Sequence, residues 1–357
     1  MHGAARRAAF LAVVAVVLLP AAAAQAKPKS VVMGLGSKTN EFNTKYGSDV
    51  NAFFPSKITI RKSGKVRFVP GGFHTLDIPP GGGSPLALFA PAGQVSGVKD
   101  AAGNPFWFNG QPNLQFNPEV LVNNYGKSFT RQGNTRIESG LPLGAGLKPI
   151  TVKFKKKGTY TYYCDVHPGM VGKVVVKGRH ARVPSAKKDR KTVKRQVRLA
   201  RTRAKKLSSV VPTGNNVSVG GSAKGGVEYF GMLPAVKTVP HGTTVRFAMS
   251  VRSRDVHTAT FGPGNPETQP TSYLGVIAAS FEGQIDQRGV YPSENPTGPL
   301  AALSPTLHGN GFWNSGAMDR SGTSPLPASN EVTFNTPGTY DFYCMIHPFM
   351  HGQIKVT

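Results

Sequence analysis

The sequence predicts an all-β chain built from two β-sandwich domains joined by a basic, helical linker. Three observations lead to this fold class. Gly (42) and Pro (29) are abundant among the 357 residues, which favours turn-rich β structure over helices. Short runs of β-branched and aromatic residues alternate with Gly, Pro and Asn, as strands alternate with turns. One local pattern also occurs twice along the chain, which predicts a duplication.

The predicted strands are short, and turn residues bound them. In the first half they include Ile58–Ile60, Val66–Phe68, Ile150–Phe154 and Tyr160–Tyr163. Many short strands of this kind are typical of a β-sandwich. Two Gly-, Pro- and Asn-rich insertions, 79–147 and 262–328, are too long for ordinary loops and could hold small strands or a binding surface. Each insertion contains a Phe-Trp pair, interpreted as local packing that pins its own loop: Phe106-Trp107 and Phe312-Trp313.

The repeat is clearest near the two cysteines. Residues 160–170 read YTYYCDVHPGM, and residues 340–350 read YDFYCMIHPFM. A His-Thr pair precedes each cysteine, and the gap from His to Cys is 90 residues in one half and 87 in the other. Landmarks in the same order at similar spacing predict two homologous domains, 27–178 and 209–357.

Residues 1–26 have the pattern of a secretory signal peptide. Arg6 and Arg7 precede an apolar stretch over residues 10–19, and Ala24-Gln25-Ala26 is a small-x-small cleavage site. The alternative, a membrane anchor, is disfavoured because the apolar run is short. We therefore expect a mature chain that starts at Lys27, has no transmembrane segment, and is secreted or periplasmic.

Residues 179–208 form a basic linker, with 13 Lys and Arg against one acidic residue. Within it, residues 185–207 contain no Gly or Pro, which predicts a helix of about 22 residues and about 33 Å. The segment could be a solvated spacer or could contact an anionic cell-envelope surface. Nucleic acid is not an expected partner, because the chain is expected to be exported. The helix shows one narrow apolar stripe of 4-3-4-3 spacing, formed by Val193, Val197, Ala200, Ala204 and Leu207.

Each half supplies two imidazoles, one thiol and one thioether. A thiolate and a thioether suit Cu(I), imidazoles suit both oxidation states, and His2Cys with a weak axial Met is the type 1 copper set. In the second half three histidines precede Cys344 and could be the upstream ligand: His241, His257 and His308. Of these, only His257 is followed by Thr, as His74 is, and only His257 lies at a similar distance before its cysteine. The predicted ligands of two copper ions are His74, Cys164, His167 and Met170, then His257, Cys344, His347 and Met350.

Three other interpretations of these residues are disfavoured. A zinc site does not use Met, and neither half offers two thiolates. A disulfide between Cys164 and Cys344 would ignore the metal-binding neighbours that each cysteine has. A buried Cys and Met that only pack in a core would leave the recurring His unexplained.

Both halves resemble plastocyanin- and amicyanin-like cupredoxins over residues 45–78 and 148–178, then 225–261 and 330–357. This resemblance implies Greek-key β-sandwiches, one-electron transfer and redox partner proteins. It also implies that electrons enter and leave through the edges of His167 and His347. The family usually has Asn beside the first His, where this chain has Thr75 or Thr258, so the bracing of the cysteine loop is altered.

Three functions fit these residues. An electron carrier needs no acid, base or nucleophile. A copper-buffering protein would use the same ligands, so the sequence does not separate the two. A copper oxidase or nitrite-reductase-like enzyme would need a second kind of copper centre, usually built from His-x-His pairs, and the sequence has none. The spare histidines of the mature chain are scattered, at His180, His241, His308 and His351.

Overall fold

The structure, a computed structural model, describes residues 27–322 and 326–357, so the signal peptide expected over 1–26 lies outside the described residues. The described chain is mostly β, with few helices. Within these ranges no helix is both long and apolar enough to cross a bilayer.

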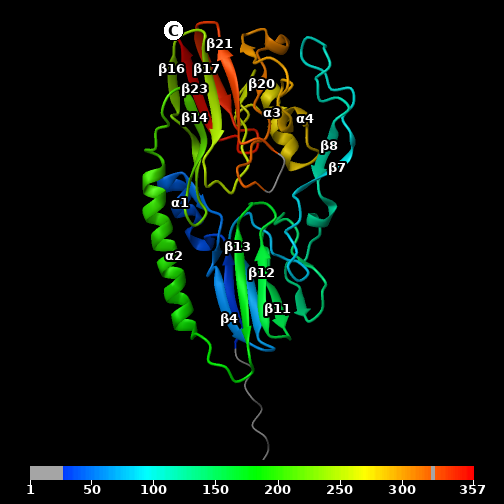
Figure 1. Ribbon diagram of the computed structural model, residues 1–357, viewed down its shortest axis with the longest axis vertical. Coiled ribbons are helices and arrows are strands. Elements are labelled where there is room, and N and C mark those ends of the chain that lie inside the picture. The colour runs from blue at the N-terminus through cyan, green and yellow to red at the C-terminus, as the bar shows by residue number, and fades with distance from the viewer. Residues whose placement is uncertain (1–26, 323–325) are drawn as a thin grey trace, which may run out of the picture.

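Two five-stranded sheets hold most strands of the first half (Figure 1). The first sheet contains, in spatial order, β3 (Phe53–Phe54), β1 (Lys29–Met33), β5 (Lys65–Pro70), β11 (Ile150–Phe154) and β9 (Ser128–Arg131). The second contains β10 (Ile137–Glu138), β6 (Asp77–Ile78), β12 (Gly158–Tyr163), β13 (Val171–Lys177) and β4 (Lys57–Arg61). Alternate residues of these strands are buried and form one apolar core, which includes Ile58, Phe68, Val152 and Val174.

The second half has two corresponding sheets. One contains β19 (Ala302–Leu303), β21 (Ser329–Phe334), β17 (Thr243–Met249), β14 (Asn216–Ala223), β15 (Val227–Leu233) and β2 (Ser48–Val50). The other contains β16 (Val236–Val239), β23 (His351–Val356), β22 (Gly338–Tyr343), β18 (Thr260–Phe261) and β20 (Trp313–Asn314). The order β1-β5-β11-β9 corresponds to β14-β17-β21-β19, and β10-β6-β12-β13-β4 to β20-β18-β22-β23-β16. Neighbouring strands in the two series also pair with the same parallel or antiparallel sense.

The helix α2 (Ala186–Leu207) occupies the basic segment and runs along one side of both halves (Figure 1). Ser185 caps its N-terminus, since the Ser185 hydroxyl accepts a hydrogen bond from the Lys188 N–H. The apolar stripe of α2 packs against α1 (Thr39–Tyr46) and β15, where Ala200, Ala204 and Leu207 are buried. The helix therefore lies against both halves of the chain.

Two segments of the first half pack on the second half. The strand β2 extends the second half's larger sheet by pairing with β15. The hairpin of β7 (Phe89–Gln94) and β8 (Pro112–Phe116) lies beside α3 (Tyr273–Ala279) and α4 (Gln287–Val290) (Figure 1). Four short 3-10 helices complete the described elements: η1 (Gly36–Lys38), η2 (Pro118–Val120), η3 (Ser280–Glu282) and η4 (Leu307–Gly309).

The interpretation that each Phe-Trp pair packs only within its own insertion is wrong for Phe106-Trp107. Phe106 and Trp107 do not pin their own insertion alone: the Phe106 ring contacts Phe312 across the two halves at 6.0 Å between centroids. The Trp107 Nε1–H donates to the backbone oxygen of Pro292. These aromatic residues and the α3 residues Leu274 and Ile277 form one apolar cluster, so the insertions join the two halves. Local sequence pattern cannot reveal a contact between residues about 200 positions apart.

Candidate metal centres

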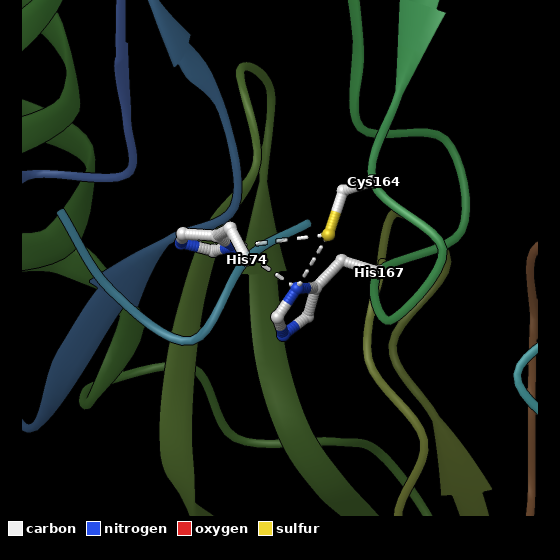
Figure 2. Close-up of side chains that lie close together, drawn as sticks. All are labelled: His74, Cys164 and His167. Carbon is white, nitrogen blue, oxygen red and sulfur yellow. Dashed lines mark hydrogen bonds between the residues drawn. The ribbon is translucent and has the colours of Figure 1, made fainter. Parts of the chain in front are cut away.

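The first candidate centre forms where β12 ends. Cys164 directly follows β12, His167 lies in the turn after it, and His74 lies in the segment between β5 and β6. Their donor atoms converge (Figure 2): the two Nδ1 atoms are 3.0 Å apart, and Cys164 Sγ is 3.4 Å from His167 Nδ1 and 4.0 Å from His74 Nδ1. All three side chains are buried. Strands from two sheets thus bring together residues 90 positions apart.

Backbone hydrogen bonds close the loop between Cys164 and Met170. The Cys164 N–H donates to the Met170 oxygen at 3.1 Å, and the Met170 N–H donates to the His167 oxygen at 3.0 Å. Gly169, at φ +79°, supplies the left-handed turn that this return needs. Met170 is fully buried in the same core cluster as Cys164. The short spacing therefore returns all three side chains to one end of the sandwich.

The second candidate centre repeats the first. His257 and His347 have Nδ1 atoms 3.1 Å apart, and Cys344 Sγ is 3.8 Å from the first and 3.9 Å from the second. The Cys344 and Met350 backbones make the same two loop hydrogen bonds, at 3.0 and 2.8 Å. Of the three candidate histidines, the structure brings His257 to the cysteine. His308 instead contacts Asp100 and Glu294 through its two ring nitrogens.

A threonine braces each cysteine loop. The Thr75 and Thr258 N–H groups each donate to the adjacent cysteine sulfur at 3.4 Å. Each threonine hydroxyl also accepts from the N–H of the residue after the cysteine, Asp165 or Met345, at 2.8 Å. The threonines therefore link the segment of the upstream His to the loop of the cysteine. This is the bracing that an Asn usually supplies in the cupredoxins that the sequence resembles.

A glycine covers the ring of each upstream histidine, a feature that sequence analysis missed. A Cβ on Gly34 would lie 2.6 Å from His74 Cδ2 and Nε2, and a Cβ on Gly220 would lie 2.9 Å from His257 Nε2. Both glycines have positive φ, +91° and +78°. Gly34 directly follows β1 and Gly220 lies within β14, and these two strands occupy corresponding places in the two halves. Two glycines at matching places in the repeat were the available sequence signal.

The electrostatic surroundings keep the first pair of imidazoles neutral. Burial lowers the pKa of His167 to about 4 and the pKa of His74 well below its usual value. Burial raises the pKa of the Cys164 thiol to about 12. An ion at this centre would therefore meet free imidazole lone pairs and displace the thiol proton.

The second centre has a different charge environment because Asp255 is close to it. Asp255 Oδ1 is 3.9 Å from His347 Nε2. Burial alone would lower the pKa of His347, but this carboxylate and Cys344 together raise it above its usual value. Burial also opposes ionisation of Cys344, but hydrogen bonds with His257 and His347 hold the pKa of that thiol well below its usual value. The pKa of Asp255 itself is lowered to about 2: burial works against this, and the nearby imidazoles, His347 first, outweigh it.

The donor sets fit a copper ion. Three donors bound at about 2.0–2.3 Å in a trigonal plane stand about 3.5–3.7 Å apart. The observed separations of 3.0–4.0 Å bracket that range in both centres. His74 Nε2 is buried without a hydrogen-bond partner among the described residues, so His74 is oriented by packing and by its Nδ1 side. Two imidazole nitrogens and a sulfur, with a buried Met beside them, favour copper over hard cations.

Both centres face one cavity between the halves, of about 800 Å³. His167 and His347 line it, and so does Asp255. Its remaining wall is largely apolar and includes Phe73, Phe230 and Phe349. A helix of 22 residues between the halves could have kept the two centres far apart, but α2 packs against both halves and the halves fold back on each other.

Comparison with known proteins matches the part of the chain that contains Cys164. Residues 100–177 match the family model of copper binding proteins, plastocyanin/azurin family. A stretch of 58 residues is 38% identical to Amicyanin-alpha of Methylorubrum extorquens, and covers 15% of this chain and 46% of that protein. The chain thus spans about half the length of this curated relative.

Solved structures with low identity were also found. Oxidised plastocyanin of Dryopteris crassirhizoma is 20% identical with a TM-score of 0.21, and the match covers 40% of this chain and 99% of that one. A purple cupredoxin of Nitrosopumilus maritimus is 14% identical with a TM-score of 0.21, over 40% of this chain and 100% of that one. The residues matched to the plastocyanin/azurin family include Cys164, His167 and Met170, so this part of the chain is similar to that family of copper binding proteins.

Proposed function

We propose that this chain is an exported electron-transfer protein with two type 1 copper centres, one in each half. The observation that supports this best is the recurrence of one donor triangle, formed by Cys Sγ and two His Nδ1 atoms, at corresponding places in two sheets of the same order. Residues that only pack in two separate cores would not be expected to form the same donor triangle twice. The duplication of residues 27–178 as 209–357, with the basic segment 179–208 between them, is part of this proposal.

The eight proposed ligands are His74, Cys164, His167, Met170, His257, Cys344, His347 and Met350. Bound copper would supply one-electron oxidation and reduction. The chain's own residues would orient the donors and exclude water, since both cysteines and both upstream histidines are buried. Thr75 and Thr258 would fix the distance between the two ligand segments of each centre.

The two centres would share one access route. The edges of His167 and His347 both line the cavity between the halves, so a redox partner or small reductant entering there would meet both. The apolar side chains of Phe230 and Phe349 lie beside His347, with ring centroids 5.0 and 6.0 Å away. The shared cavity disfavours separate electron-entry sites on different faces of the molecule.

Export and surface contacts are proposed from the sequence. The signal-peptide pattern of residues 1–26 supports a secreted or periplasmic location. The basic residues of α2 would give an anionic cell-envelope surface a place to bind, and salt-dependent sedimentation of the protein with cell envelopes would test this.

A copper count and a visible spectrum test the central proposal. Two coppers per chain are expected, with an intense thiolate-to-Cu(II) band. Cys164→Ser and Cys344→Ser should each remove about one copper and about half of the colour, and the double variant should remove both. A colourless copper-loaded chain would contradict the proposal.

The alternatives give different results. A copper-buffering protein would bind the metal but would not exchange electrons rapidly with a small redox reagent at a measurable reduction potential. A copper enzyme would hold more than two coppers per chain. Among the described residues, the spare histidines do not gather into a further cluster of metal-binding side chains.

A further inference from the structure

Three buried carboxylates meet beside the first copper centre. Asp77 begins β6, Glu138 ends β10 and pairs directly with Asp77, and Asp165 follows Cys164. Each residue offers one oxygen within 4.8 Å of the others. Their exposed fractions are 0%, 8% and 5%, so water does not solvate this charge.

The cluster lacks the positive charge that it needs. Its one ion pair within the described ranges joins Asp77 to Arg136, which leaves two carboxylates uncompensated. Burial raises the pKa of Glu138 to about 9, and the charge of Asp165 adds to that rise. A buried carboxylate without a counter-charge costs several kcal/mol, so the cluster must take up protons or a cation.

Two oxygens of the cluster also have no hydrogen bond. Asp77 Oδ1 and Glu138 Oε2 are buried and find no donor in the described part of the chain. Their sister oxygens are used: Glu138 Oε1 accepts from the Gly140 N–H at 2.8 Å, and Asp77 Oδ2 accepts from Arg136. Each side chain is thus oriented by one oxygen while the other faces no protein donor.

The second half shows that the fold does not require these acids. The corresponding positions there are Thr260, Asn314 and Met345, where Thr260 pairs with Asn314 as Asp77 pairs with Glu138. The Thr260 hydroxyl donates to Asn314 Oδ1 at 2.8 Å, and Asn314 Nδ2 donates to the backbone oxygens of Arg288 and Tyr291. One copy of the site is neutral and fully hydrogen-bonded, while the other is acidic and is not.

We propose that Asp77, Glu138 and Asp165 bind one hard divalent cation of the Ca²⁺ type. Carboxylate oxygens are the donors that Ca²⁺ prefers, and two oxygens bound to one Ca²⁺ at about 2.4 Å can stand up to about 4.8 Å apart. A divalent cation together with Arg136 would neutralise the three carboxylates. Copper is disfavoured here because no sulfur or imidazole belongs to the cluster.

The proposed ion would stiffen the first copper centre without touching its ligands. Asp165 Oδ2 accepts from the Thr75 hydroxyl at 2.8 Å, and Asp165 Oδ1 accepts from the Leu86 N–H at 2.9 Å. Fixing Asp165 would therefore fix Thr75, which braces the Cys164 loop. The proposal does not rest on copper binding, because the carboxylates need a counter-charge in either case.

Calorimetric titration of the full-length, metal-stripped chain with CaCl₂ alone, together with thermal melting, tests this site. One Ca²⁺ per chain and a higher melting temperature are expected. Glu138→Gln, which is remote from the copper ligands in sequence, should weaken Ca²⁺ binding at least about tenfold. Grafting the second half's residues, as D77T/E138N/D165M, should abolish it.

Glu228→Gln is the matched control, because Glu228 is also a buried acid but lies outside the cluster. This variant should bind Ca²⁺ as the wild type does. Absence of Ca²⁺ binding at millimolar concentration, or equal binding by Glu138→Gln, would overturn the proposal and leave the cluster protonated. If the triple variant does not fold, Ca²⁺ binding by Glu138→Gln alone tests the site. The visible absorbance of the copper-loaded Glu138→Gln variant tests the proposed function separately.

Discussion

Replacing Gly34 with Ala should disable the first proposed copper centre without altering any of its proposed ligands. The added Cβ would lie 2.6 Å from Cδ2 and Nε2 of His74 and 2.8 Å from the Gly71 oxygen. Carbon atoms pack at about 3.5 Å or more, so the His74 ring must move by about 0.9 Å. A ring shift of this size would change the separation of the two Nδ1 atoms, now 3.0 Å, by a substantial fraction of that distance.

The expected loss follows from this displacement. Changes to groups that hold a metal ligand in place typically reduce metal affinity by about 10- to 100-fold. An alanine at φ +91° also costs about 1–2 kcal/mol of stability through backbone strain. We therefore expect copper affinity at the first centre to fall by at least about tenfold, with a modest loss of overall stability.

Competition between the protein and a copper chelator measures this affinity. A Cys344→Ser background leaves only the first centre to report through its visible absorbance. Gly93→Ala is the control: Gly93 has the same φ of +91°, but no atom lies within 4 Å of its added Cβ. If Gly34→Ala and Gly93→Ala bound copper equally well, the glycine would not hold the ring and the reasoning would be wrong.

Three further comparisons between variants test packing and charge. Tyr162→Phe should raise the free energy of unfolding by about 1–3 kcal/mol, because the buried Tyr162 hydroxyl has no partner among the described residues. Phe342→Tyr, at the matching position of β22, should lower it in denaturant unfolding, and an unchanged stability in both variants would contradict this. Burial raises the pKa of Glu228 well above its usual value, so its stabilising contribution is full below about pH 4.5 and is lost as the pH rises through the folded-state pKa. The stability of the wild type relative to Glu228→Gln should therefore fall as the pH rises above about 4.5, whereas a difference that does not change with pH would refute the shift. Ala204→Asp should cost more than about 2 kcal/mol because it buries a charge beneath α2, while Leu199→Asp, on the exposed side, should cost little in the same unfolding assay.

Local patterns predicted the ligand loops and the main strands. The strands expected around Val66–Phe68 and Tyr160–Tyr163 lie within β5 and β12. Alternation and aromatic content are local properties, so they can be read without knowing the fold. The Cys-x2-His-x2-Met spacing is local too, because the turn itself returns the ligands to the cysteine. The helix expected over 185–207 lies at Ala186–Leu207 for the same reason.

Contacts between distant segments could not be predicted. The β2 strand of the first half pairs with β15 of the second, and Phe106 meets Phe312, although nothing in either segment specifies its partner. The shared cavity follows from these contacts, and so does the place of Asp255 between the centres. The acidic cluster was missed in the same way, because Asp77 and Glu138 look like ordinary solvated acids until β6 and β10 pair.

The two proposed centres have the same candidate donors but different surroundings, and this predicts unequal reduction potentials. Negative charge near a metal centre favours its oxidised state, so the carboxylates of Asp77, Glu138 and Asp165 should lower the potential of the first centre when they are ionised. Asp165 is the nearest, since it adjoins Cys164, where the second half has Met345. If the cluster binds Ca²⁺, adding Ca²⁺ should raise the potential of the first centre and leave the second nearly unchanged. Redox titration of the two single-centre variants, Cys344→Ser and Cys164→Ser, with and without Ca²⁺ separates these effects. An equal shift in both would mean that Ca²⁺ acts through the general field of the protein and not through a site beside Cys164.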